Sequence, residues 1–266
     1  MKIYLVKDKE YPKDFVICYL LYFENDKRFY VEWDDGIDLD ILPMPFDALA
    51  KKGQKYIDSY WSKIWVQQRI VPSNRQNITQ ILLNNNMDSY DEFELLIVDK
   101  GRCCHDELYL EEVKELPETI KEKFNKHVNI VSLIGDDSLI VIFNDGVIKK
   151  YYFNEIINEK DVHNIVNNNL LFYLEEDTGG YGIRWLNNIK VSYDELYEKG
   201  TLLPLVKSEL ECFIKDQIIN TKDATEILNC SRQNIDDLVK REKIKPIKEW
   251  KKNKIFFKSD LLKRVR

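Results

Sequence analysis

The side chains with the clearest potential for chemistry lie near the C-terminus, where arginine, glutamine, asparagine and lysine recur at short spacing. Between residues 231 and 241, the positions outside the apolar pattern are polar or cationic. They are Ser231, Arg232, Gln233, Asn234, Lys240 and Arg241. Arginine, glutamine and asparagine form paired hydrogen bonds with base edges, and lysine and arginine bind phosphate. These residue types therefore favour nucleic-acid recognition.

Residues 221–241 are predicted to form two short amphipathic helices, which would position these side chains. Thr221 and Ser231 are predicted N-caps, because a hydroxyl oxygen can accept hydrogen bonds from first-turn amides. The i, i+3, i+4 spacing of apolar residues gives each helix one face for packing. These residues are Ala224, Ile227, Leu228, Ile235, Leu238 and Val239. A three-residue turn between the helices is typical of a helix-turn-helix.

Two β-prone runs follow in residues 244–257, around a Lys251-Lys-Asn-Lys254 tip. Ser259 is then predicted to cap a final helix. Two strands and a helix after a helix-turn-helix form a winged arrangement.

The order of these motifs resembles the excisionase-type branch of the MerR-like winged helix-turn-helix family. The resemblance covers about a fifth of the chain and rests on Thr221-Lys-Asp-Ala224, Ser231-Arg-Gln233, Lys240-Arg241, Ile244-Lys-Pro-Ile247 and Lys258-Ser-Asp-Leu-Leu262. It implies that a recognition helix enters the major groove, with Arg232, Gln233 and Asn234 facing base edges. It also implies that a wing follows the DNA backbone or minor groove, with Lys251, Lys252 and Lys254 on phosphates. The expected DNA-binding residues are Ser231, Arg232, Gln233, Asn234, Lys240, Arg241, Lys245, Lys251, Lys252 and Lys254.

Two positions depart from this family pattern. Asn229 stands where a glycine usually ends the first helix, and asparagine tolerates the left-handed conformation that such an end needs. Glu242 stands where a glycine usually follows the Lys-Arg pair, so the entry to the wing is expected to differ.

The charge of the chain is segregated along the sequence. Residues 216–266 hold 14 Lys and Arg against 8 Asp and Glu, whereas residues 1–126 hold 18 against 24 and residues 127–215 hold 8 against 14. A basic module on an acidic body is typical of a nucleic-acid binder with a regulatory or oligomerising partner domain. A lysine-rich tail can also be only a solubilising face, but capped helices and a wing favour a binding module.

Length and composition favour a folded, multidomain α+β protein. The 266 residues are 44% hydrophobic, and we expect two small acidic α+β domains, over residues 1–126 and 127–215, before a winged helix-turn-helix over 216–266. The longest apolar run, over residues 15–23, is too short to span a bilayer, and no signal peptide is evident. Five cysteines at irregular spacing favour reduced thiols and a cytoplasmic location, with no membrane partner.

Residues 127–215 resemble a small bacterial α+β domain, the domain-of-unknown-function family numbered 2442. The resemblance rests on Phe143-Asn-Asp-Gly146, Gly182-Ile-Arg-Trp185 and Asp194-Glu-Leu-Tyr197. Strands are predicted over 128–134, 139–143 and 147–153, with an Asp-Gly hairpin turn, a helix over 155–166 and a turn at Gly179-Gly180. Some members of that family accompany toxin-like partners, so the resemblance implies an autoregulating antitoxin as one role.

Residues 1–126 resemble the N-terminal regions of uncharacterised proteins of low-GC bacteria. Strands are predicted over 2–6, 15–23 and 29–33, and a helix is expected to begin at Pro72-Ser73 and run through Leu83. Trp61, Trp65 and Arg69 recur every four residues and share one helical face. Either this face packs into the core, which we favour, or Arg69, Arg75 and Gln76 form a partner or anion site.

Other clusters in this region favour no metal site or catalytic centre. Cys103, Cys104 and His105 have no second Cys or His pair nearby, so structural cysteines are favoured over a metal site. The carboxylates between residues 34 and 40 lack the offsets of a calcium loop and are interpreted as a solvated hairpin. Three histidines and no phosphate-binding glycine loop argue against catalysis. An acid-only, magnesium-dependent nuclease stays open, and no cofactor is expected.

Two functions remain as hypotheses. The first is a bacterial or phage transcription regulator, a repressor or autoregulator that binds double-stranded DNA, with a homodimer reading paired half-sites. The alternative is an antitoxin or anti-defence inhibitor, whose acidic body binds a basic protein partner while its helix-turn-helix represses its own operon.

Overall fold

The computed structural model describes residues 1–186, 189–203, 207–250 and 253–265, and the fold is mixed α+β, as the sequence predicts. The chain divides into two compact units, Met1–Lys123 and Phe124–Arg266. Across the described residues, no helix combines the length and apolar character that a bilayer crossing needs.

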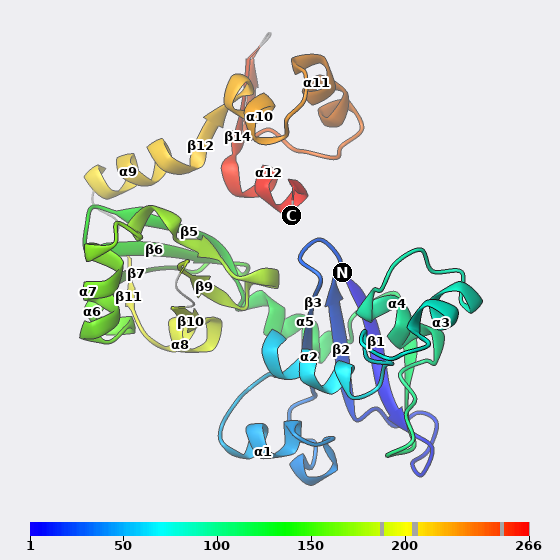
Figure 1. Cartoon of the computed structure of the whole chain (residues 1–266). Helices are drawn as coiled ribbons and strands as arrows, with labels where there is room; N and C mark the ends of the chain where they lie inside the picture. Colours follow the sequence, from blue (N-terminus) through cyan, green and yellow to red (C-terminus); the bar gives the residue numbers. More distant parts are fainter. Residues whose placement is uncertain (187–188, 204–206, 251–252, 266) are drawn as a thin grey trace. The chain divides into compact units, whose positions relative to one another are not determined.

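The first unit is built on an antiparallel sheet with the strand order β3-β2-β1-β4 (Figure 1). The strands are β1 (Lys2–Asp8), β2 (Cys18–Phe23), β3 (Arg28–Glu32) and β4 (Leu108–Val113). The three N-terminal strands confirm the predicted positions, except that β2 begins at Cys18. The helical elements are η1 (Leu39–Ile41), α1 (Phe46–Lys51), α2 (Ser59–Gln67), α3 (Ile78–Asn84) and α4 (Glu92–Val98).

Helix α2 packs its apolar face into the core of this unit. Trp65 and Val66 are buried with Leu20 of β2 and Val31 of β3. The favoured prediction, that this helix packs tryptophan into the core, is confirmed for Trp65, while Trp61 is partly buried against the same core. Helix α3 begins at Ile78 and not at Pro72-Ser73, because residues 73–77 form turns before it.

The second unit contains a four-stranded antiparallel sheet of order β11-β7-β6-β5 and a smaller sheet of order β10-β9-β8. The strands are β5 (Val128–Ile134), β6 (Ser138–Phe143), β7 (Ile148–Tyr152), β8 (Glu175–Glu176), β9 (Gly182–Arg184), β10 (Lys190–Ser192) and β11 (Thr201–Leu202). The helical elements are α5 (Glu118–Asn125), which crosses the unit boundary, α6 (Phe153–Ile156), α7 (Glu159–Asn167), η2 (Leu171–Tyr173), η3 (Thr178–Gly180), α8 (Tyr193–Glu198) and α9 (Lys207–Gln217).

The predicted Asp-Gly hairpin turn is confirmed, and the helix predicted after it is wrong as a single element. The β6–β7 turn runs through Asp145 and Gly146, and Tyr197 donates a hydrogen bond to Asp145 at 2.6 Å. The single helix predicted over 155–166 is two helices, because the backbone is extended at Ile157 and Asn158 then caps α7.

A third sheet lies in the C-terminal part of the second unit, with the order β12-β14-β13. Its elements are β12 (Ile218–Asn220), α10 (Thr221–Ile227), α11 (Arg232–Lys240), β13 (Lys248–Trp250), β14 (Asn253–Phe257) and α12 (Lys258–Val265). They enclose a small core of Ile219, Ala224, Ile235, Ile244, Phe256 and Leu261. We call residues 218–265 the C-terminal segment.

Candidate nucleic-acid interface

Side-chain caps fix the starts of α10 and α11. The Asn220 side chain accepts hydrogen bonds from the amides of Lys222 and Asp223, so Asn220 and not Thr221 is the N-cap of α10. Thr221 is instead buried, and its hydroxyl donates to the backbone oxygen of Lys254 at 3.3 Å. Ser231 is confirmed as the N-cap of α11, because its Oγ accepts from the Asn234 amide.

The turn between α10 and α11 places the two helices against one core. Asn229 adopts a left-handed backbone with φ of 45°, as expected from its place at the end of the first helix. Ala224 of α10 and Ile235 of α11 are fully buried in the same cluster. Glu242, after α11, also has positive φ, at 55°, the conformation that a glycine would adopt without strain.

The N-terminal end of α11 exposes Ser231, Arg232, Gln233 and Asn234 in succession. The next residue, Ile235, is buried and anchors the opposite side of the helix. The predicted base-reading residues therefore come together on one short exposed stretch.

Two carboxylates on α11 are paired with cations of the same segment. Asp236 accepts from Lys254 at 2.6 Å, and this hydrogen bond lowers the pKa of Asp236 and raises the pKa of Lys254. Asp237 pairs with Arg241 at 3.2 Å, one turn along the helix. Pairing reduces the repulsion that unpaired carboxylates on α11 would exert on a polyanion.

Lys254 lies inside the fold and does not present a free ammonium for a phosphate. The residue is 8% exposed, and its Nζ also pairs with Glu249 at 3.1 Å. The role predicted for Lys254 therefore needs correction: it joins α11 to the β13–β14 pair.

Of the other cations predicted to bind DNA, the structure describes three and leaves two outside the described residues. Lys240, Arg241 and Lys245 are exposed after the polar stretch of α11. Lys251 and Lys252 lie outside the described residues.

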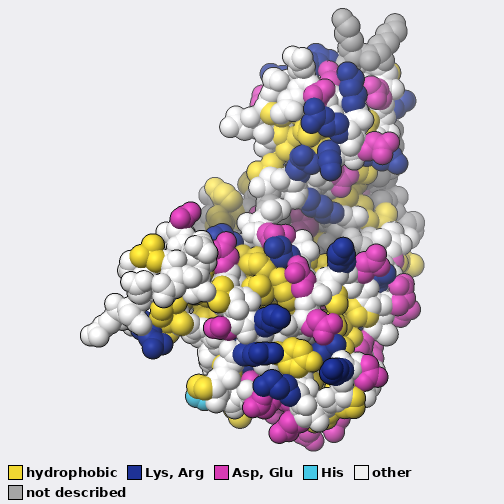
Figure 2. Space-filling view, turned by 90° about the vertical axis from the view of Figure 1, so that its right-hand side faces the viewer, with side chains coloured by type: hydrophobic (Ala, Val, Ile, Leu, Met, Phe, Trp, Pro, Cys, Tyr) yellow, Lys and Arg dark blue, Asp and Glu magenta, His cyan; other side chains and the backbone are white. Residues whose placement is uncertain are grey.

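Further exposed residues near α11 were missed by the sequence reasoning. Lys243 and Lys248 are exposed, and Trp250 is 43% exposed with the Lys248 ammonium 5.9 Å from its ring centroid. An alternating pattern of buried and exposed residues could not have identified Lys248 and Trp250, because residues 247–250 are all exposed. Lys and Arg side chains gather on the face of the C-terminal segment seen at the top of Figure 2, with carboxylates among them.

The second predicted site, around Arg69, Arg75 and Gln76, is not built by Arg69. Its guanidinium lies 4.0 Å from the Trp65 ring centroid, donates to the backbone oxygen of Gly101 at 3.0 Å and forms a two-point ion pair with Asp106. Arg75 and Gln76 are exposed in the turn before α3. Arg69 therefore holds the loop before β4 against α2, and the anion-site prediction needs correction at this residue.

No group of three or more His, Cys, Asp or Glu residues suited to a metal ion occurs among the described residues. All five cysteines are free. The acidic stretch after β3 is not a hairpin: Asp34 accepts from the Tyr19 hydroxyl at 2.6 Å, and Asp38 caps η1.

Comparison of the chain with protein-family models, with curated proteins and with solved structures finds no match. A function is therefore inferred from the residues of the chain and their geometry.

Proposed function

We propose that the C-terminal segment is a winged helix-turn-helix and that the chain is a sequence-specific DNA-binding transcription regulator of bacterial or phage origin. The observation that carries this proposal is the arrangement of α11. Its first turn exposes Arg232, Gln233 and Asn234, while Ile235 holds the helix on the core. In helix-turn-helix proteins, the N-terminal residues of the second helix contact base edges in the major groove.

The surroundings of α11 suit this role. An α-helix with its side chains is about 10–12 Å across, which fits a major groove about 12 Å wide. Lys240 and Lys245 follow the polar stretch and would contact phosphates on the flank of the groove, and Arg241 would do so by exchanging Asp237 for a phosphate. The Asp236–Lys254 and Asp237–Arg241 pairs reduce the negative charge that α11 would otherwise bring to the DNA.

One recognition helix reads only a few base pairs, so a homodimer on paired half-sites is the expected binding form. The acidic remainder of the chain would then serve for assembly or regulation. The protein would be a repressor or autoregulator without catalytic activity.

The test is selection of duplexes from a random DNA library by the full chain at near-physiological salt. We expect enrichment of one defined motif. Arg232→Ala or Gln233→Ala should cost about 1–3 kcal/mol, which is roughly 5- to 150-fold in affinity, and relax preference at one position of the motif.

Lys245→Ala should instead weaken binding to all sequences and reduce the slope of log affinity against log salt by about 0.9. Lys160→Ala, which removes an exposed lysine from α7, is the matched control and should leave binding unchanged. Absence of any enriched motif would contradict the proposal and favour an inhibitor or antitoxin that binds a basic protein.

A further inference from the structure

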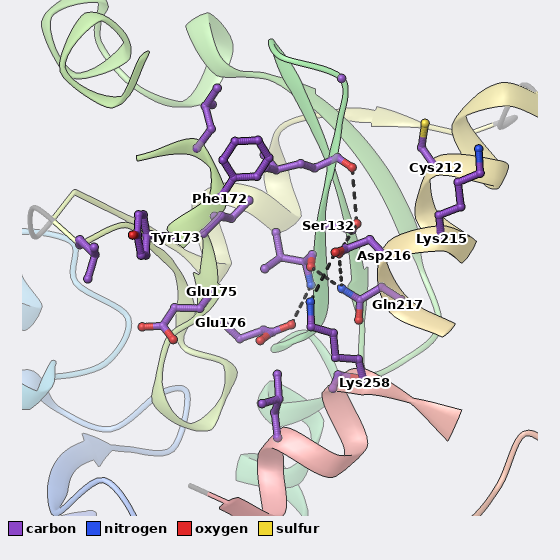
Figure 3. Close-up of a pocket in the computed structure, with 18 residues that line it drawn as sticks. Ser132, Phe172, Tyr173, Glu175, Glu176, Cys212, Lys215, Asp216, Gln217 and Lys258 are labelled. Atoms are coloured by element: carbon purple, nitrogen blue, oxygen red, sulfur yellow. Dashed lines mark hydrogen bonds and ion pairs between the residues drawn. The ribbon is translucent and has the colours of Figure 1, made fainter. Parts of the chain in front are cut away.

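A groove of about 680 Å³ opens in the second unit (Figure 3). Its back is β5, the edge strand of the four-stranded sheet. One side comes from η2 and β8, and the other from the end of α9 and the start of α12. Elements from the C-terminal segment and from the preceding part of the second unit therefore line the same groove.

The part of the groove formed by η2 and Leu186 is apolar and unusually exposed. Phe172 is 86% exposed and Tyr173 is 55% exposed, and Leu186 on the same groove is 61% exposed. Among the described large hydrophobic residues, Phe172 has the greatest exposed fraction. A large exposed apolar patch that is bordered by polar residues marks an interaction surface.

Several polar groups in the groove are already paired with one another. Asp216 accepts from Ser132 at 3.0 Å and from Gln217 at 2.9 Å, and its other oxygen lies 3.4 Å from the Lys258 ammonium (Figure 3). An occupant that supplies only a charge would compete with these contacts. The groove instead favours an occupant that supplies apolar surface.

An added β-strand is also disfavoured at the back of the groove. The Val131 amide donates to Glu176 at 3.0 Å, and the Val131 carbonyl accepts from Gln217 at 3.3 Å. These side chains cover the outward amide and carbonyl of Val131, near the middle of β5, where an extended peptide would need them for pairing with the edge.

The groove and its neighbouring aromatic side chain have the properties of a self-complementary surface. In a two-fold interface the same patch serves both copies, so a projecting group and the hollow that receives it must lie side by side. Phe172 projects at the border of the groove. β8 supplies Glu175, which pairs with Arg184 at 2.7 Å, and Glu176. The opposite side supplies Lys258, which pairs with Asp216, and the exposed Lys215, so a two-fold axis would bring Lys215 of each copy towards the acidic β8 of the other.

We propose that this groove is the interface of a symmetric homodimer, in which Phe172 of each copy enters the groove of the other. The inference rests on the proposed function for its purpose: α9 leads into β12 and α12 belongs to the C-terminal segment, so dimerisation here would fix the spacing of two α11 helices.

The test is the mass of the full chain in solution without DNA, measured by sedimentation velocity over roughly 1–100 μM, the range of a moderate dimer affinity. We expect the wild-type chain at twice its mass of 31.8 kDa. Phe172→Glu should raise the dimer dissociation constant at least about 100-fold, because it places a charge in a desolvated apolar contact. Tyr173→Glu should act in the same direction.

The matched control is Leu202→Glu, at a leucine that is 64% exposed on β11 and does not line the groove. It should dimerise like the wild type, and circular dichroism should match for all variants. A monomeric wild type, a Phe172→Glu variant that still dimerises, or equal loss in the control would each overturn the inference. If the groove receives another protein or a small ligand instead, the wild-type chain should be monomeric.

The two proposals fail separately. A dimer that depends on Phe172 but selects no DNA motif refutes only the proposed function. A monomer that selects a motif of one half-site refutes only the dimer interface.

Discussion

Replacing Lys254 with methionine tests whether this lysine positions α11 and does not contact DNA. The change keeps an apolar stem of similar length but removes an ammonium that pairs with Asp236 at 2.6 Å and with Glu249 at 3.1 Å. Both carboxylates would lose their partner, and the link between α11 and the β13–β14 pair would be lost. The main expected effect is therefore loss of local stability around α11.

The magnitude follows from burial. Fully exposed ion pairs contribute about 0–1 kcal/mol, whereas breaking a buried pair costs about 3–5 kcal/mol. The Lys254 side chain is only 10% exposed, but those of Asp236 and Glu249 are 41% and 47% exposed, so water can solvate the carboxylates after the change. We therefore expect a loss of about 1–2 kcal/mol, which increases the open population roughly 5- to 30-fold.

The assay is amide hydrogen exchange of the full chain, followed in peptides that cover α11 and β14. Protection should fall there and stay unchanged in peptides from the first unit. Lys245→Met, at an exposed lysine of the same segment, is the control and should leave protection intact. Unchanged protection of α11 in Lys254→Met would refute the positioning role.

DNA binding provides a second readout for the same pair of variants. If Lys254 makes no phosphate contact, Lys254→Met should weaken binding while keeping the slope of log affinity against log salt. Lys245→Met should reduce that slope by about 0.9. A reduced slope in Lys254→Met would mean that the ammonium leaves its carboxylates to bind DNA.

Three further predictions concern the rest of the fold. Burial lowers the pKa of His127 from 6.5 to about 4, so between pH 6.5 and 4 the unfolded chain binds a proton that the folded unit does not. Urea titrations should show a stability loss on the order of 3 kcal/mol as pH falls through this window, and His127→Gln should remove it. Arg69→Met should destabilise the first unit by about 3 kcal/mol in urea titrations, because it leaves a partly buried carboxylate unpaired, whereas the exposed Arg75→Met should change little. Gly180→Ala should lower the Tm of the second unit by several degrees, because its Cβ would lie 2.4 Å from the backbone oxygen of Val128 at a φ of +73°.

Local signals in the sequence were sufficient where one residue decides the outcome. Ser231 caps α11 as predicted. An apolar helical pattern follows it, and its two neighbours, Cys230 and Arg232, are not preferred N-cap residues. At the start of α10, Asn220 and Thr221 are adjacent and both can cap a helix. Strand β12 pairs with β14 as far as Asn220, and the Thr221 hydroxyl then donates to a backbone oxygen of β14. This pairing joins segments far apart in the sequence, so local helix-capping preferences cannot predict which of the two residues caps α10.

Arg69 illustrates the same limit for a candidate site. Helical spacing correctly places Arg69 on the face of Trp65, but its acceptors, Gly101 and Asp106, lie more than thirty residues later in the chain. An arginine on such a face can bind an external anion or form an internal ion pair. The outcome depends on whether the loop that contains Gly101 and Asp106 folds back against α2. The folded sheet, in which β4 pairs with β1, brings the loop back.

The burial of Lys254 could have been predicted from the two-residue period of a β-strand. Side chains two residues apart point to the same face of a strand, and Lys254 stands two residues before Phe256, which is 1% exposed. Counting every lysine of the basic module as a DNA contact therefore overstates the cationic surface. Under the proposed function, the Lys254 ammonium is removed from the candidate phosphate contacts because two carboxylates of its own segment hold it. Among the described residues, exposed cations such as Lys240 and Lys245 remain candidates.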